Sequence, residues 1–182
     1  MIKLMEYLDI YDNDGKPLGL KKTKKEAHNE GLWHKAAHVW IVNSKSEVLI
    51  QRRSPKVDNH PNQWDISAAG HISAGEDDIT SALREVEEEI GLKLTPENLI
   101  LIGIVKQQSA RKGYINNEIN PVYVLKMDLN PNEIKKQEDE VAEVKFIPRK
   151  ELQRFIESKD PSFVPHPEEF VLLFDYLNKN YG

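Results

Sequence analysis

The chain of 182 residues contains no cysteine. Disulfide bonds, catalysis by a thiolate and zinc sites built on cysteine are therefore all excluded. The sequence also lacks any apolar run long enough for a signal peptide or a membrane span, and acidic residues occur within its first ten positions. These absences predict a cytoplasmic protein that has no membrane partner.

Positive charge is in the minority, because 25 Lys and Arg face 30 Asp and Glu, which gives a formal net charge of −5. Such a chain is poorly suited to broad binding of a nucleic acid backbone, so no nucleic acid polymer is expected as a partner. An anionic small molecule would need local positive charge or a metal ion. The length suits one domain with a full hydrophobic core, residues 1–182, and leaves a homodimer open.

The hydrophobic pattern predicts one mixed α/β domain with a substantial sheet and a few helices. An N-terminal extension of about residues 1–30 contains a hairpin that turns at Asp12 to Gly15. The other expected strands lie within 36–53, 99–108, 120–129 and 140–148, with a polar loop at 109–119. The expected helices are 77–91, 150–158 and 168–179.

The helix predicted at 77–91 carries four glutamates in five positions, Glu85 and Glu87 to Glu89. At about 100° per residue, three of them share an arc of roughly 100° that borders the apolar face, whereas Glu87 points elsewhere. Carboxylates crowded at the edge of a core need a cation to offset them, and their oxygens suit Mg²⁺ or Mn²⁺. The alternative is a solvated acidic face, which is common.

The residues around this helix favour the cation. Residues 70–92 read G-x5-E-x7-R-E-V-x-E-E-x-G-L, from Gly70 to Leu92. This run resembles the Nudix box, G-x5-E-x7-R-E-U-x-E-E-x-G-U with U an aliphatic residue, at every fixed position. The resemblance implies an α/β/α sandwich in which the box forms a loop, a helix and a second loop. It also implies hydrolysis of a diphosphate that is linked to another moiety.

The same resemblance implies a metal site. Glu85, Glu88 and Glu89 would hold the divalent ions, Mg²⁺ or Mn²⁺, and the carbonyl of Gly70 would add a ligand. A metal that bridges the phosphates neutralises developing charge and makes its bound water more acidic. A nearby carboxylate, Glu85 or Glu88 of the box, can then take the proton as water attacks phosphorus.

Other acidic and basic residues have supporting roles by resemblance. Arg84 is expected to pair with a box carboxylate and hold its rotamer, and Glu76 to act through bound water. Glu118 is a further candidate for the catalytic base or a ligand, with an ordinary glutamate in a polar loop as the alternative. Glu140 lies in a loop where many Nudix hydrolases keep an additional base or ligand, although acidic loops before strands are commonplace.

Beyond the box, roughly residues 6–128 resemble the type I isopentenyl diphosphate isomerases, a branch of the Nudix superfamily, through LDIYDNDGKPLG, LWHKAAHVWIVNSKSEVLIQRR and NQWDISAAGH. Three departures argue against isomerase activity. Ala69 stands where that branch has its catalytic cysteine, Glu85 where it has a substrate-binding arginine, and Asn116 where it has one of two acidic ligands. The chain therefore resembles an isomerase scaffold that has kept the hydrolase box.

Histidines of this chain fall on positions that the isomerase branch uses for metal. His34 and His71 match two of them, and His28 lies near a third with a spacing one residue shorter. Because Asn116 replaces a carboxylate, we expect His34 and His71 to hydrogen-bond in or beside the substrate cleft and His71 to contact substrate. A second metal site is the alternative.

Three more residues are candidates for contact with substrate. Arg53 aligns with a diphosphate-binding arginine of the isomerase branch, and its guanidinium suits paired phosphate oxygens. Trp64 is a candidate for the wall of the pocket, although a strand tryptophan more often belongs to the core. Phe163 and the prolines around it are candidates for a lid.

The sequence as a whole predicts a Mg²⁺- or Mn²⁺-dependent diphosphohydrolase of a small molecule. The diphosphate would belong to a nucleoside di- or triphosphate, with an isoprenoid diphosphate as the alternative. A Nudix module that binds a nucleotide without cleaving it is less favoured, because such modules usually lose box glutamates and all of them are present here.

Overall fold

A computed structural model describes residues 5–182, so the first four residues of the predicted N-terminal extension lie outside the described residues. The strands are β1 Tyr7–Tyr11, β2 Pro17–Thr23, β3 Trp33–Val42, β4 Glu47–Arg53, β5 Trp64–Asp65, β6 Ala68–His71, β7 Leu99–Arg111, β8 Tyr114–Lys126 and β9 Val141–Pro148. The helices are α1 Lys24–Glu30, α2 Asp78–Ile90, α3 Arg149–Glu157 and α4 Pro167–Tyr181, with 3₁₀ turns at Pro96–Asn98 and Pro131–Glu133. In this part of the chain, no helix combines the length and apolarity needed to span a bilayer.

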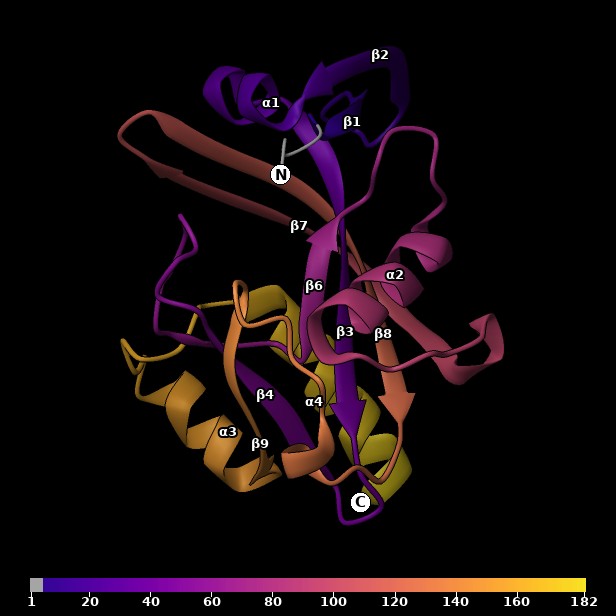
Figure 1. Ribbon diagram of the computed structural model, residues 1–182, viewed down its shortest axis with the longest axis vertical. Coiled ribbons are helices and arrows are strands. Elements are labelled where there is room, and N and C mark those ends of the chain that lie inside the picture. The colour runs from indigo at the N-terminus through magenta and orange to yellow at the C-terminus, as the bar shows by residue number, and fades with distance from the viewer. Residues whose placement is uncertain (1–4) are drawn as a thin grey trace.

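Strand β3 is the centre of the sheet (Figure 1). It pairs in parallel with β8 and antiparallel with β6, and its last residues, Ile41 and Val42, pair with β4. β7 extends the sheet beyond β8, and β9 and β5 extend it beyond β4. The N-terminal hairpin of β1 and β2 joins the other end of β3 through Tyr11 and Trp33.

The two faces of the sheet are covered by different helices, α2 on one face and α4 with α3 on the other (Figure 1). Successive side chains of β3 point to opposite faces. Val39 and Ile41 therefore pack with α2, whereas Trp40 and Val42 pack with α4. The predicted α/β/α sandwich and the predicted N-terminal hairpin are both confirmed.

Helix α2 carries the box glutamates, and its ends are fixed by local sequence. The side chain of Asp77 caps the first turn by accepting a hydrogen bond from the Thr80 backbone N–H at 2.9 Å. Gly91 ends the helix in the left-handed region, at φ 72°, which glycine adopts without steric cost. Ala82, Val86 and Ile90 are fully buried against the sheet, so the whole helix is held in one orientation.

Two elements differ from the prediction. The expected polar loop at 109–119 is wrong, because β7 and β8 continue as a long hairpin that pairs as far as Arg111 and Tyr114 and turns at Lys112 and Gly113. Backbone hydrogen bonds between β7 and β8 hold these polar residues in strands, although their side chains show no alternating hydrophobic pattern. Helix α1 was not expected, although Thr23 and Glu26 form a capping box at its start.

Candidate metal and substrate site

The Glu85 carboxylate packs directly onto Gly70 of β6. A Cβ atom built on Gly70 would lie 2.1 Å from the carboxyl carbon of Glu85, far inside van der Waals contact. Only glycine therefore lets the strand and the box helix approach this closely. The glutamate side chain is 8% exposed, so its carboxylate is held at the protein interior beside the Gly70 backbone.

Substituting Gly70 by Ala is expected to displace the Glu85 carboxylate while the fold survives, because the clashing atoms are the far end of a flexible side chain. A displacement of about 1 Å costs on the order of 100-fold in activity when the group takes part in the reaction. Turnover and thermal unfolding measure the two effects separately. Gly19→Ala is the matched control, since it sits at φ 68° with open space around it and is expected to lose stability but not activity. Equal activity of Gly70→Ala and wild type would contradict the placement of Glu85.

Glu89 lies one turn further along the helix and is 4% exposed. Its Oε2 accepts hydrogen bonds from the Gln51 side chain at 3.0 Å and from the Ala69 backbone N–H at 3.1 Å. Gln51 is itself 2% exposed on β4, and its Oε1 is buried without a hydrogen-bond partner in residues 5–182. Both donors bind one oxygen of Glu89, so its Oε1 takes part in neither of these contacts.

Arg84 lies among the acidic groups of the box. Its guanidinium contacts Glu85 Oε1, lies 3.0 Å from Glu76 Oε2 and 3.4 Å from Glu88 Oε2, and donates to the His71 carbonyl at 3.0 Å. This matches the expected pairing of Arg84 with a box carboxylate. The contact with Glu76 is direct, whereas the sequence suggested a role through bound water.

The three box glutamates do not converge on one point in the structure. Two groups of His and carboxylate residues in the described chain bring their ligand atoms within 4.8 Å of one another, and the trio Glu85, Glu88 and Glu89 is not one of them. Glu88 is exposed, and Arg84 lies between it and Glu85. The arginine thus offsets charge that a divalent ion would offset, and ion binding would require these carboxylates to turn away from it.

The positive charge that the protein places around Glu85 and Glu89 does not offset the burial of their carboxylates. Burial raises the pKa of Glu85 to about 7 even though Arg84 opposes the shift. Burial, together with the charges of Glu85 and Glu140, raises the pKa of Glu89 well above its usual value. A divalent cation is the group that would keep both carboxylates ionised at neutral pH, so this donor set fits Mg²⁺ or Mn²⁺.

Relative to a Glu85→Gln variant, the metal-free protein is therefore expected to lose stability as pH rises from 5 to 7. Glu85 keeps its proton longer in the folded state than in the unfolded state, so its contribution is full below pH 4.5 and declines until the pH passes about 7. The shift corresponds to about 3 kcal/mol, or a fall in Tm on the order of 10 °C. Thermal unfolding in EDTA across this range measures it.

A variant separates this effect from other titrating groups. Burial opposes protonation of His38, but the charge of Glu169 raises its pKa to about 9, so its contribution is full below pH 6.5 and is lost as pH rises through about 9. Glu85→Gln is therefore expected to lack only the Glu85 part of the change between pH 5 and 7, while the contributions of His71 and Glu89 in this range and the fall due to His38 above it remain. A curve that stays unchanged in Glu85→Gln would contradict the assignment.

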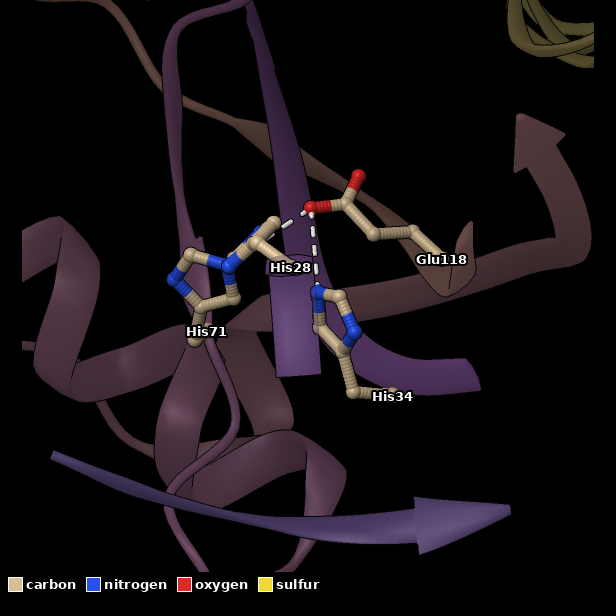
Figure 2. A group of neighbouring side chains, drawn as sticks. All are labelled: His28, His34, His71 and Glu118. Carbon is tan, nitrogen blue, oxygen red and sulfur yellow. Dashed lines mark ion pairs between the residues drawn. The ribbon is translucent and has the colours of Figure 1, made fainter. Parts of the chain in front are cut away.

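One of the two groups of closely spaced ligand atoms consists of His28, His34, His71 and Glu118. It lies where β3, β6, β8 and α1 meet. Figure 2 shows the rings of His34 and His71 directed toward the same oxygen of Glu118, with Nε2 atoms 3.9 and 3.7 Å away. His28 Nε2 lies 3.0 Å from Asn116 Oδ1. We call these four residues the histidine cluster.

Two ring nitrogens of the histidine cluster lack the hydrogen bonds that were expected from the sequence for His34 and His71. Nε2 of His34 and Nε2 of His71 are buried and have no hydrogen-bond partner in the part of the chain that the structure describes. The other nitrogen of His34 lies 2.8 Å from the Leu32 carbonyl, which fixes its ring as a metal-binding histidine requires. Burial holds the pKa of His71 well below its usual value, so its ring is neutral.

The remaining candidates are placed in different surroundings. Arg53 is partly exposed and bound to Asp65, near enough to Glu89 for its charge to oppose the rise in that pKa. The half-buried ring of Trp64 faces Lys145, whose Nζ lies 4.3 Å from the ring centre, and its backbone pairs with Phe163. Phe163 is 6% exposed and packs in the core with Phe155 and Phe170, which does not suit a lid.

Sequence reasoning missed a buried polar network on the α4 face. Asp65, His38, His166 and Glu169 are all at most 7% exposed and bound to one another in pairs. Neither His38 nor His166 belongs to a sequence motif. The pattern H-P-E-E at 166–169, at the start of α4, was the one local signal.

The chain matches the family model described as the NUDIX domain over residues 32–171. It belongs to the Nudix family. It is similar to Nudix hydrolase 3 of Arabidopsis thaliana, with 38% identity over 96% of this chain, and to a Nudix hydrolase of Clostridium acetobutylicum, with 36% identity over 85% of this chain. The match covers 23% of the Arabidopsis protein and 75% of the clostridial one.

Other similarities of this Nudix protein agree with the isomerase-like branch and with the fold. An isopentenyl-diphosphate Delta-isomerase of Escherichia coli is 27% identical over 88% of this chain and 86% of its own length. A MutT protein of Methanosarcina mazei superposes with a TM-score of 0.62 at 21% identity, over 81% of this chain and 96% of that one. A protein of Deinococcus radiodurans gives the same TM-score at 19% identity, over 84% and 90%.

Proposed function

We propose that this Nudix protein is a divalent-metal-dependent hydrolase that cleaves the diphosphate bond of a nucleoside di- or triphosphate or a related X-linked diphosphate. The observation that carries the proposal is the placement of Glu85 and Glu89. Both carboxylates are nearly buried on one side of α2, one seated on Gly70 and the other held by Gln51 and Ala69, and both have raised pKa values.

Each residue around the box has a defined task in this proposal. Glu85, Glu88, Glu89 and the Gly70 carbonyl would hold Mg²⁺ or Mn²⁺. The ion would neutralise charge on the phosphates and make a bound water more acidic. Arg84 fixes the Glu85 rotamer and is itself fixed by Glu76 and the His71 carbonyl. Arg53 would bind phosphate oxygens.

A proton acceptor is needed near the attacked phosphorus. Glu85 is suited to this task, since its carboxylate lies beside the Gly70 backbone at the proposed metal site and the cation would keep it ionised and able to accept a proton. Glu118 is less suited, because its carboxylate faces His34 and His71 in the histidine cluster. We therefore propose Glu85, or Glu88 next to it, as the base.

The histidine cluster provides a second candidate position for a cation. Three imidazoles and one carboxylate suit Mn²⁺ or another transition metal better than Mg²⁺, which prefers oxygen ligands. Asn116 takes the place of a carboxylate there and already contacts His28. Uptake of Mn²⁺ that persists in a Glu89→Gln variant would report an ion at this cluster.

Hydrolysis is favoured over double-bond isomerisation because Ala69 occupies the position of the catalytic cysteine of the isomerase branch. The side chain at this position has no proton to exchange, and the sequence contains no cysteine that could replace it. The similarity to isopentenyl-diphosphate Delta-isomerases nevertheless keeps an isoprenoid diphosphate as the second candidate substrate. A nucleotide-binding module without activity is the third candidate.

A phosphate-release screen tests these candidates together. The panel contains nucleoside di- and triphosphates, sugar nucleotides and isoprenyl diphosphates, each with Mg²⁺ or Mn²⁺. Release from a nucleotide is the expected result, and release from isoprenyl diphosphates alone would select the second candidate. Tight binding of one compound with no release from any would overturn the proposal in favour of the module.

A further inference from the structure

Asp65 of β5 connects two parts of the chain that are distant in sequence, β4 and the start of α4. It is 5% exposed, and each of its oxygens has a charged or ring N–H partner. His166 Nε2 lies 2.7 Å from Oδ1, and Arg53 NH1 lies 3.1 Å from Oδ2. Burial would raise the pKa of Asp65, but His166 and Arg53 outweigh it and hold the pKa well below its usual value. Asp65 is therefore an ionised acceptor for both partners.

The Arg53 guanidinium is oriented by two fixed acceptors. Its Nε donates to the Asn59 carbonyl at 2.9 Å while its NH1 donates to Asp65. Its side chain remains 24% exposed, which leaves the outer part of the fork accessible. Its charge reaches Glu89, because it counteracts the rise in the pKa of that carboxyl. The arginine thus lies beside the box with its orientation already set.

His166 is brought to Asp65 by backbone pairing. The Trp64 N–H donates to the Ser162 carbonyl at 2.7 Å, and the Val164 N–H donates to the Trp64 carbonyl at 2.8 Å. Two residues later the His166 ring lies between Asp65 and Gln107, whose Oε1 is 3.3 Å from Nδ1. Both ring nitrogens therefore face oxygen acceptors, and the C-terminal segment contacts Oδ1 of Asp65 while Arg53 contacts Oδ2.

We propose that Asp65 and His166 are positioning residues that hold the Arg53 guanidinium in place for the phosphates of the substrate. The inference rests on the proposed function in one respect, the contact between Arg53 and phosphate. The physical reason is preorganisation: an arginine already held by acceptors loses less side-chain freedom when it binds an anion. His166 acts through Asp65, since it fixes the carboxylate that fixes the arginine.

The alternative is that the network only anchors α4 to the sheet. A neighbouring pair offers a matched control for that role. Glu169, in the first turn of α4, accepts hydrogen bonds from Trp40 Nε1 at 2.6 Å and contacts His38 Nδ1 at 2.7 Å. It anchors the same end of the same helix, and it approaches the Asp65–Arg53 pair only through His166, whose Nδ1 lies 4.0 Å from Glu169 Oε2, compared with 2.7 Å between His166 Nε2 and Asp65. Glu169→Gln is therefore expected to lower the Tm without changing KM.

Asp65→Asn tests the inference directly. The amide keeps the size of the side chain, but its NH₂ group faces an N–H donor, so one of the two hydrogen bonds, that from Arg53 or that from His166, is lost. We expect KM to rise about tenfold with kcat within about twofold, and the Kd for inorganic pyrophosphate with Mg²⁺ to rise in parallel. Steady-state kinetics and calorimetry measure the two quantities.

A double-mutant cycle distinguishes positioning from a structural role. Arg53→Ala alone is expected to raise the pyrophosphate Kd about 30-fold, but only about threefold in the Asp65→Asn background, because the arginine is already misplaced there. If Asp65→Asn does not fold, His166→Phe replaces it in the cycle, and His166→Gln, which can still donate to Asp65, is expected to recover part of the affinity. Additive effects, or a KM increase in Glu169→Gln equal to that of Asp65→Asn, would overturn the inference.

The outcomes also separate this inference from the proposed function. Coupling between Asp65 and Arg53 in pyrophosphate binding, together with no phosphate release from any substrate, would leave the positioning role standing and remove the hydrolase. Hydrolysis by the wild type, together with additive effects of the two substitutions on pyrophosphate binding, would leave the hydrolase standing and remove the positioning role.

Discussion

Glu89→Gln is expected to lower turnover by about 10³-fold or more while the protein stays folded. The amide can turn its oxygen toward the Gln51 and Ala69 donors that now bind Glu89 Oε2, so the local packing is retained. Its NH₂ group then replaces a carboxylate oxygen that would bind the cation. Losing a metal ligand removes several kcal/mol of charge stabilisation, which corresponds to this loss of rate. Steady-state turnover and thermal unfolding of the metal-free protein measure both parts.

The helix supplies its own control for this substitution. Glu87 is exposed, points away from the other three glutamates and lies 3.4 Å from Lys93 at the surface. Glu87→Gln removes the same charge from the same helix and is expected to leave turnover within about twofold, as an exposed ion pair contributes little. Full activity of Glu89→Gln would show that the metal assignment is wrong.

Removal of divalent cations is the second change with a large expected effect. With excess EDTA at pH 8, turnover is expected to fall to background, and millimolar Mg²⁺ is expected to restore it. The cation is needed because Glu85 and Glu89, with raised pKa values, cannot both be ionised in a buried site without an opposing charge. Phosphate release before and after chelation, with elemental analysis of the treated protein, measures the effect.

The same treatment is expected to change stability in a pH-dependent way. Mg²⁺ should raise the Tm more at pH 8, where both carboxyls must ionise, than at pH 5, where they hold protons. A protein shown by elemental analysis to be metal-free that still turned over at its full rate would contradict a role for the ion.

The box helix shows how much of this site the sequence can predict. The apolar pattern predicts a helix within 77–91, and the structure places it at Asp78–Ile90, with Asp77 as its N-cap and Gly91 at its end. Spacing alone indicates that Glu85 and Glu89 border the buried face. The close approach of Gly70 to Glu85 could not be predicted from the spacing, since it depends on how β6 packs against α2.

The parts that the sequence failed to predict are held by long-range pairing. Residues 109–119 read as a polar loop because strands were inferred from alternating apolar residues, yet Ser109 pairs with Asn116 and Ala110 with Ile115 in a regular ladder. A polar hairpin of this kind gains its order from backbone hydrogen bonds, which leave no pattern in the side chains.

The buried polar network of Asp65, His38, His166 and Glu169 was hidden for a similar reason, whereas the histidine cluster was indicated by resemblance. His166 reaches Asp65 across 101 positions of sequence, and Glu169 reaches His38 across 131. His28 reaches the histidine cluster because α1, which was not predicted, carries it to His34 and His71. Residues that meet only through tertiary packing carry no local spacing from which a site could be inferred.

The most direct test of the account is a calorimetric titration of Mg²⁺ into EDTA-treated, dialysed protein at pH 8. Mg²⁺ is the appropriate ion because it prefers oxygen ligands and so discriminates against the histidine cluster. Saturable uptake in the millimolar range or tighter by the wild type and by Glu87→Gln, and none by Glu89→Gln, is the predicted result. Absence of uptake by the wild type, or equal uptake by Glu89→Gln, would contradict the claim that a divalent cation binds beside the glutamates of α2.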